Sequence, residues 1–197
     1  MKISLKWLKE FVSIDIEPEK IDEILTSLGI EVEKIIRTGE KFNNFVIGQV
    51  IKCEAVKGSD HLHYCEVQVV DKSYSVVCGA PNVDEGQKVV LGLAGAIVPQ
   101  NGMILERRKI RGVESNGMIC SRFELGLDED HSGIWVLPED ASEGISLAEY
   151  LGENDVIFEI SITPNRGDCL SHLGIARELA AYFDLPINLP KININEN

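Results

Sequence analysis

The sequence predicts an α+β protein in which a closed five-stranded β-barrel is inserted into a small discontinuous α/β domain. Three changes of pattern along the chain support this prediction. Helical spacing of apolar residues dominates residues 1–38, short strands separated by turns fill residues 39–150, and a strand followed by a helix occupies residues 151–190. Residues 191–197 are predicted to form a linker.

The first segment is predicted to contain two helices and a strand. Leu5 and Leu8 share one face of the first helix. Pro18 suits the first turn of the second helix, because its missing N–H group would have no helical partner there. Gly29 stands where a helix C-terminus is expected, and Ile30–Ile36 then alternates well enough to form a strand.

The middle segment contains a series of short apolar runs. The predicted strands are Phe45–Val56, Leu62–Val70, Tyr74–Gly79, Lys88–Leu93, Met103–Ile110, Gly117–Ser121 and Ile134–Leu137. We place a tight turn at Glu114–Gly117, where small polar residues and glycine interrupt the pattern. Many short strands at regular spacing are typical of closed or sandwiched sheets, and closure removes exposed edges. The number and lengths of the strands fit a five-stranded OB barrel.

The third segment returns to mixed structure. Val156–Ile162 is predicted to form a strand, and Asp168 is predicted to cap the N-terminus of a helix that ends before Pro186. Neither this segment nor the first one is long enough to bury a good core alone. We therefore expect the two flanking segments to pack together.

Composition and charge exclude several protein classes. Apolar content of 44% and charged content of 26% are typical of a soluble globular protein. The chain lacks the run of about 18 apolar residues that a membrane span needs, and the charges in MKISLKWLKE exclude a secretory signal. Five cysteines without C-x-x-C spacing indicate reduced thiols in a cytoplasmic protein.

The chain is acidic, with a net charge of −13. Residues 39–150 carry 10 Lys and Arg against 17 Asp and Glu, a net charge of −7. Strong non-specific nucleic-acid binding needs a basic face that displaces counterions. The charge therefore argues against DNA as a partner, and we expect no membrane partner either.

The predicted barrel contains one basic cluster. It consists of Arg107, Arg108, Lys109 and Arg111. One interpretation is a ridge that contacts phosphates. The other is a hairpin edge that charge keeps soluble, which the acidic surroundings favour.

No metal site and no catalytic set is expected. His61, His63 and Cys65 alternate, so they point to one face of a strand, but a zinc site would need a fourth ligand that the spacing does not supply. The sequence contains no nucleophile elbow, phosphate-binding loop, HExxH or dinucleotide motif.

Six blocks of sequence together resemble one known family. They are IRGVESNGMICSRFELG (Ile110–Gly126), VVCGAPN (Val76–Asn82), TPNRGDCL (Thr163–Leu170), MKISLKWLKEFV, HSGIWVLP (His131–Pro138) and GIARELAAYFDLP (Gly174–Pro186). These blocks, in the order in which they follow one another along the chain, are similar to the N-terminal region of the β subunit of a bacterial phenylalanyl-tRNA synthetase. The resemblance runs from Met1 to about Pro186. It implies a tRNA-binding type of OB fold, and a chain that is the N-terminal piece of a longer subunit.

The resemblance also implies a function. The parent enzyme joins phenylalanine to its tRNA with ATP and Mg²⁺, and its synthetic site lies in a partner α subunit of an α2β2 heterotetramer. The chain itself would be non-catalytic and without a cofactor, contributing weak tRNA binding, subunit packing or both in the cytoplasm. Two alternatives remain: a stand-alone OB-fold RNA-binding protein, and a purely structural interaction module.

Further candidate residues follow from the same resemblance. In related stand-alone domains the turn that carries Ser115 and Met118 lines a tRNA-facing groove, so Met118 could stack on a base and Ser115 could bind a phosphate. The alternative is a tight turn with Met118 in the core. Asn82 ends the VVCGAPN block and is a further candidate for tRNA binding. Related domains carry Lys or Arg where His61 and His63 stand, which predicts weak binding.

Overall fold

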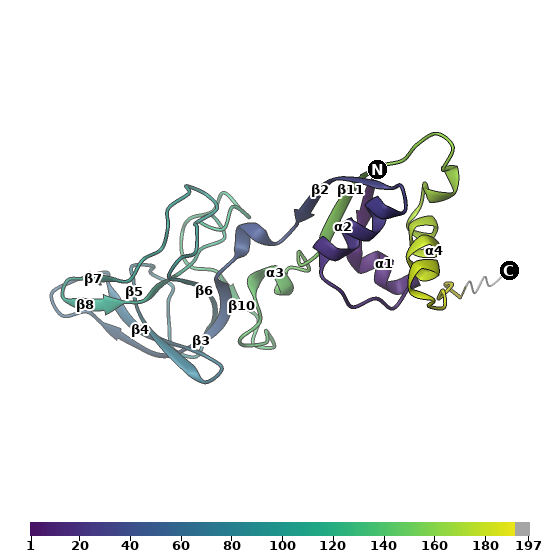
Figure 1. Cartoon of the computed structure of the whole chain (residues 1–197). Coiled ribbons are helices and arrows are strands. Elements are labelled where there is room, and N and C mark those ends of the chain that lie inside the picture. The colour runs from purple at the N-terminus through teal and green to yellow at the C-terminus, as the bar shows by residue number, and fades with distance from the viewer. Residues whose placement is uncertain (192–197) are drawn as a thin grey trace, which may run out of the picture. The chain divides into compact units, whose positions relative to one another are not determined.

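The computed structural model describes residues 1–191, so six of the seven residues of the predicted linker lie outside the described part. Contacts divide the chain into two compact units. The discontinuous unit consists of Met1–Thr38 together with the segment that begins at Asn154, and the barrel unit is Gly39–Glu153 (Figure 1). Within residues 1–191, every helix is too short or too polar to span a membrane.

The discontinuous unit combines helices with a three-stranded antiparallel sheet. Its elements are β1 (Lys2–Ser4), α1 (Leu5–Phe11), α2 (Pro18–Ser27), β2 (Glu31–Arg37), β11 (Val156–Ser161), a 3₁₀ turn (Gly167–Cys169) and α4 (His172–Phe183). The central strand is β11, which pairs with β1 on one side and β2 on the other. The two flanking segments therefore share one sheet. They also share one core, in which Ile3, Leu25, Phe158 and Leu179 are completely buried.

Local sequence explains most of the helix ends. The hydroxyl of Ser4 accepts a hydrogen bond from the N–H of Trp7 and caps α1. Pro18 is the first residue of α2, and Gly29 follows that helix with φ of +79°. The predicted cap of the last helix is wrong. Ser171 caps α4, whereas Asp168 lies in the preceding 3₁₀ turn.

The regular structure of the barrel unit consists mainly of strands, which are joined by turns and loops. Its elements are a 3₁₀ turn (Glu40–Phe42), β3 (Phe45–Ala55), β4 (His63–Val69), β5 (Lys72–Cys78), β6 (Lys88–Leu93), β7 (Arg108–Ile110), β8 (Val113–Ser115), β9 (Gly117–Ile119), β10 (Val136–Leu137) and α3 (Leu147–Tyr150). The main sheet has the order β10-β6-β3-β4-β5, and β9 also pairs with β6. All of these pairs are antiparallel.

Two hydrogen bonds bring the ends of this sheet together. The N–H of Asn116 donates to the carbonyl of Ser75 at 2.7 Å, and the N–H of Val77 donates to the hydroxyl of Ser115 at 3.1 Å. They join β5 to the segment between β8 and β9. The strands β5, β4, β3, β6 and β9 thus form a nearly closed antiparallel barrel, which confirms the predicted fold class.

The region of the predicted tight turn differs from expectation. The strand predicted over Met103–Ile110 is formed only at its end, as β7, which makes a hairpin with β8. The tight turn lies at Arg111 and Gly112, whose φ values are +48° and +84°. Two successive left-handed residues are typical of the two-residue turn that matches the twist of a hairpin. The prediction of a tight turn at Glu114–Gly117 is wrong. These residues are the end of β8, the connecting residue Asn116 and the start of β9.

Candidate nucleic-acid interface

A groove of about 670 Å³ opens on the barrel unit. Its walls come from the end of β5, from β7 and β9, and from the loop between β9 and β10. Met118 and Phe123 supply apolar surface, while Arg108 and His131 supply polar groups. The rings of Phe123 and His131 lie 5.4 Å apart at an angle of 55°. The groove therefore combines flat apolar surface with a cation.

The basic cluster occupies the hairpin beside this groove. Arg107, Arg108 and Lys109 are exposed, and no ion pair of theirs is recorded among residues 1–191. Of these three, only Arg108 lines the groove. Arg111 at the tip is engaged within the protein, because its Nη1 donates to the carbonyl of Gly58 at 3.0 Å.

Ser115 and Met118 lie in different environments. The side chain of Ser115 is almost completely buried, with 2% exposed. Its hydroxyl accepts from the N–H of Val77 and donates to the carbonyl of Gly117 at 3.0 Å. The hydroxyl hydrogen is therefore used inside the barrel. Met118 is half-buried and lines the groove, so it contributes both to packing and to the candidate surface.

The two histidines do not line the groove. His61 is exposed in the loop between β3 and β4, so the prediction that it shares one strand face with His63 and Cys65 is wrong. His63 begins β4 and is half-buried. Its Nδ1 atom is buried and has no hydrogen-bond partner among the described residues.

Asn82 acts as a clamp between two loops. Its Nδ2 donates to the carbonyl of Ile134 at 3.0 Å, and its Oδ1 accepts from the N–H of the same residue at 2.9 Å. A side chain at Gly133 would collide with Asn82. Asn82 therefore positions the loop that carries His131 into the groove. Neither Phe123 nor His131 was among the candidate residues that the sequence predicted for this surface.

The charge of the groove is mixed. Glu124 lines one wall, and its Oε2 accepts from the N–H and the hydroxyl of Ser121 at 2.7 and 2.8 Å. The buried thiol of Cys78 also lines the groove, and burial raises its pKa, so it stays neutral. A ligand would thus meet the Arg108 cation and the Glu124 carboxylate in one hollow.

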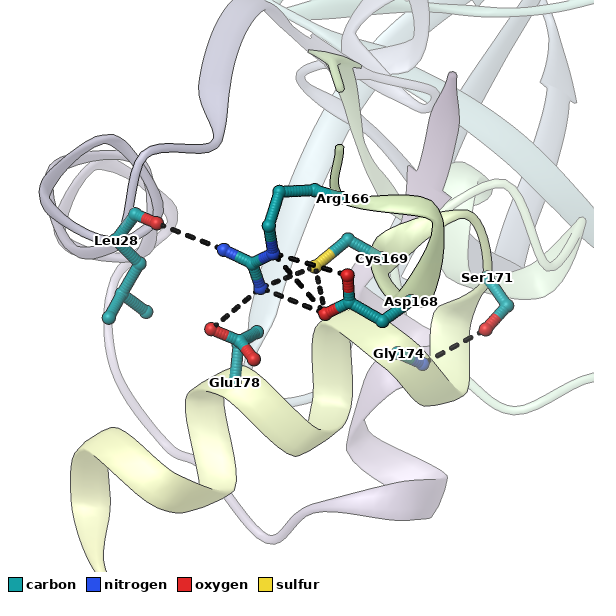
Figure 2. A network of polar contacts seen from close by, with 7 residues as sticks. All are labelled: Leu28, Arg166, Asp168, Cys169, Ser171, Gly174 and Glu178. Atoms are coloured by element: carbon teal, nitrogen blue, oxygen red, sulfur yellow. Dashed lines mark hydrogen bonds and ion pairs between the residues drawn. The ribbon is translucent and has the colours of Figure 1, made fainter. Parts of the chain in front are cut away.

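The discontinuous unit holds the one cluster among residues 1–191 that resembles a metal site. Ligand atoms of Asp168, Cys169 and Glu178 lie within 4.8 Å of one another. Figure 2 shows the Arg166 guanidinium among them. Its Nη2 lies 3.0 Å from Asp168 Oδ2 and 3.0 Å from Glu178 Oε2. Hydrogen bonds from Arg166 also lower the pKa of Asp168.

This network has a structural explanation. Arg166 supplies the positive charge that a metal ion would otherwise bring to the two carboxylates. It connects the loop after β11 to α4 through Glu178, and its Nη1 approaches the carbonyl of Leu28 at 3.5 Å. Arg166 therefore fixes the end of the TPNRGDCL block, and the cluster needs no metal.

Comparison with known proteins finds similarity along the whole chain to one subunit of a ligase. The chain is 43% identical over 197 residues to the "Phenylalanine--tRNA ligase beta subunit" of Syntrophus aciditrophicus, and 46% identical to that of Fusobacterium nucleatum. Both alignments cover 100% of this chain but only 24% and 25% of the relatives. The chain thus spans about a quarter of the length of these subunits, and it matches their N-terminal region.

Two further comparisons match about half of the chain. A solved structure of a MetRS related protein from Pyrococcus horikoshii is 23% identical with a TM-score of 0.40, covering 52% of this chain and 87% of that chain. The family described as "Putative tRNA binding domain" matches residues 45–146. Because this match extends over more than half of the sequence, the chain belongs to that family of tRNA-binding domains.

Proposed function

We propose that this chain is the non-catalytic N-terminal region of the β subunit of phenylalanine–tRNA ligase. The alignment of the whole chain with such subunits at 43–46% identity supports the proposal. The parent enzyme would attach phenylalanine to its tRNA in the cytoplasm with ATP and Mg²⁺, using an α subunit in an α2β2 assembly. The chain would contribute tRNA contact, subunit packing or both.

The groove beside β7 is the surface that best suits tRNA. Arg108 is exposed at its rim, and Arg107 and Lys109 stand next to it on the same hairpin. Cations of this kind contact phosphates, whereas aromatic faces such as Phe123 can stack on an unpaired base. The single observation that carries the assignment is the Arg108 cation over an aromatic-lined groove in a barrel of the tRNA-binding family.

The same geometry supports weak binding. The acidic barrel repels phosphates, and Arg111, Ser115 and Asn82 are all engaged in hydrogen bonds within the protein. We therefore assign Ser115 and Asn82 to the framework of the groove, and the phosphate contacts to Arg107, Arg108 and Lys109.

Titration of the chain with fluorescently labelled tRNA tests this proposal. We expect weak binding whose affinity falls steeply with added salt. Replacing Arg107 and Arg108 by Ala should abolish most of the binding and reduce its salt dependence. Replacing His61 and His63 by Lys should raise the affinity, because it makes the acidic barrel unit less negative.

Arg177→Ala provides a matched control. Arg177 is an exposed arginine on α4 in the discontinuous unit. Its replacement by Ala changes the net charge by as much as Arg108→Ala does, but it removes no residue that lines the groove. Equal losses for Arg108→Ala and Arg177→Ala would contradict a specific contact. Absence of binding even at low salt, with no gain from the lysine variant, would leave subunit packing as the function of the barrel.

A further inference from the structure

Two cysteines of the barrel unit face each other across neighbouring strands. Cys53 on β3 and Cys65 on β4 are partners in the antiparallel register. Their Sγ atoms are 3.9 Å apart, and both thiols are free. The other three cysteines serve as comparisons in the same molecule.

The register fixes which kind of pair they form. The N–H of Val56 donates to the carbonyl of Leu62 at 2.8 Å, so these opposed residues form a hydrogen-bonded pair. Hydrogen-bonded and non-hydrogen-bonded pairs alternate along an antiparallel ladder. Cys53 and Cys65 lie three steps further along, which makes them a non-hydrogen-bonded pair.

That position suits a disulfide. Cα atoms of non-hydrogen-bonded pairs are about 4.5 Å apart, and disulfides accept Cα separations of about 4.4–6.8 Å. The two sulfur atoms can therefore reach bonding distance by rotation of the side chains, without movement of the strands.

The two thiols differ in access. Cys53 is half-buried, and its only recorded polar contacts in the described chain are the carbonyl of Val83 at 3.8 Å and the sulfur of Cys65. Cys65 is completely buried, and burial raises its pKa. Cys53 is thus the thiol that a small-molecule oxidant can reach first. Cys65 is the thiol that lies close enough to react with Cys53 in a second step.

We infer that Cys53 and Cys65 form a reversible oxidation site, and that a small-molecule disulfide such as oxidised glutathione is the oxidant. The Cys53 thiolate attacks one sulfur of oxidised glutathione, whose S–S bond breaks and releases one glutathione thiolate. The Cys65 sulfur then attacks Cys53 Sγ, the mixed disulfide bond breaks, and the Cys65 proton passes to the departing sulfur, which leaves as the second glutathione. Two protein thiols are oxidised, and one glutathione disulfide is reduced to two glutathiones.

The new bond would close the base of the loop that joins β3 to β4. That loop presents the carbonyl of Gly58 to Arg111, so oxidation stiffens the support of the basic hairpin. Cytosolic disulfides of this kind are usually transient and redox-sensing. The inference does not depend on tRNA binding.

Oxidation of the intact chain followed by peptide mapping tests this inference. After incubation with oxidised glutathione, acid quenching and alkylation of the remaining thiols in denaturant, we expect three alkyl groups per chain where the reduced chain carries five, with residues 53 and 65 in one linked peptide. The melting temperature of the barrel unit should rise, because the link constrains the unfolded chain. Dithiothreitol should reverse both changes.

Variants separate this pair from the other thiols. Cys53→Ser and Cys65→Ser should each abolish the link, whereas Cys169→Ser, a buried cysteine of the other unit, should leave it intact. If either barrel variant fails to fold, the peptide map of the oxidised chain without substitutions still shows whether Cys53 and Cys65 are linked. A glutathione adduct that persists on Cys53, a link from Cys53 to Cys78, or no reaction would overturn the inference.

Discussion

Single side chains on β5, β8 and the loops decide how well the barrel closes. Ser115 is the clearest case, because its hydroxyl takes the place of a backbone carbonyl opposite Val77. The sequence suggested a phosphate ligand at this position. A buried hydroxyl that both accepts and donates within the barrel is better suited to joining strands that are distant in sequence.

We predict that Ser115→Ala destabilises the barrel unit by about 1–3 kcal/mol, because the N–H of Val77 loses its partner in a buried setting. Chemical denaturation measures this change. Ser73→Ala is the matched control, since Ser73 lies exposed on the same β5 strand and its loss should be nearly neutral. At a temperature where both variants are folded, an unchanged affinity for tRNA would support the framework role. A loss of tRNA affinity in Ser115→Ala but not in Ser73→Ala would instead indicate that Ser115 contacts a phosphate.

Contacts between elements add a dependence on pH. His172 is the first residue of α4, and its Nε2 accepts a hydrogen bond from the N–H of Ser4 at the start of α1. Its ring stacks on Trp7, with centroids 3.9 Å apart. Burial lowers the pKa of His172, against an opposing effect of Asp155. The neutral ring is therefore the form that joins the two helices.

We predict that the discontinuous unit loses stability as the pH falls below about 6.5, the ordinary value for histidine. Below that pH the His172 side chain of the unfolded chain binds a proton, whereas in the folded chain its lowered pKa keeps it neutral. The contribution of His172 to the free energy of unfolding is therefore fully present above about pH 6.5, and it is lost as the pH falls towards the folded pKa. Urea unfolding in a Trp135→Phe background, where Trp7 is the remaining tryptophan, measures this. His172→Gln keeps an acceptor but cannot titrate, and should flatten the dependence. His131→Gln is the control, because His131 lies in the barrel unit, and it should leave the pH dependence of the discontinuous unit's stability unchanged.

Elements with strong local patterns could be predicted from the sequence. Lys88–Leu93 was predicted with the bounds of β6, because apolar residues and flanking turn signals agree there. The β1 strand and the α3 helix were missed, since each is too short to show a period. The turn at Arg111 and Gly112 was misplaced, because arginine is an unusual residue in a left-handed conformation.

The candidate site was predictable in part for the same reason. Arg108 and Met118 stand out as a charge cluster and a block of turn residues, and both line the groove. Phe123 and His131 come from an irregular loop, which carries no periodicity to read. Asn82 was predicted to contact tRNA. In the folded chain its side chain hydrogen-bonds to the backbone of Ile134, which lies 52 positions away in the sequence, so the sequence alone could not reveal this contact.

At the scale of the whole molecule, the barrel interrupts a unit that is otherwise continuous in space. β2 and β11 are register partners up to Arg37 and Val156. The next pair also meets, because the N–H of Thr38 donates to the carbonyl of Asp155 at 3.0 Å. The ends left by removal of the barrel therefore already stand opposite each other in a ladder. An antiparallel pair in this position needs only a short turn to become a hairpin.

We predict that replacing residues 39–154 by Asn-Gly yields a folded discontinuous unit. Thr38 and Asp155 would flank a two-residue turn at a hydrogen-bonded pair, the geometry that Asn-Gly favours. The core of Ile3, Leu25, Phe158 and Leu179 contains no residue of the barrel, so a cooperative melt and a mixed helix and strand circular dichroism spectrum are expected. Replacement by Pro-Pro is the control, because proline cannot adopt the turn and should broaden or abolish the transition. A non-cooperative melt of the Asn-Gly variant would mean that the barrel is needed to hold the two flanking segments together.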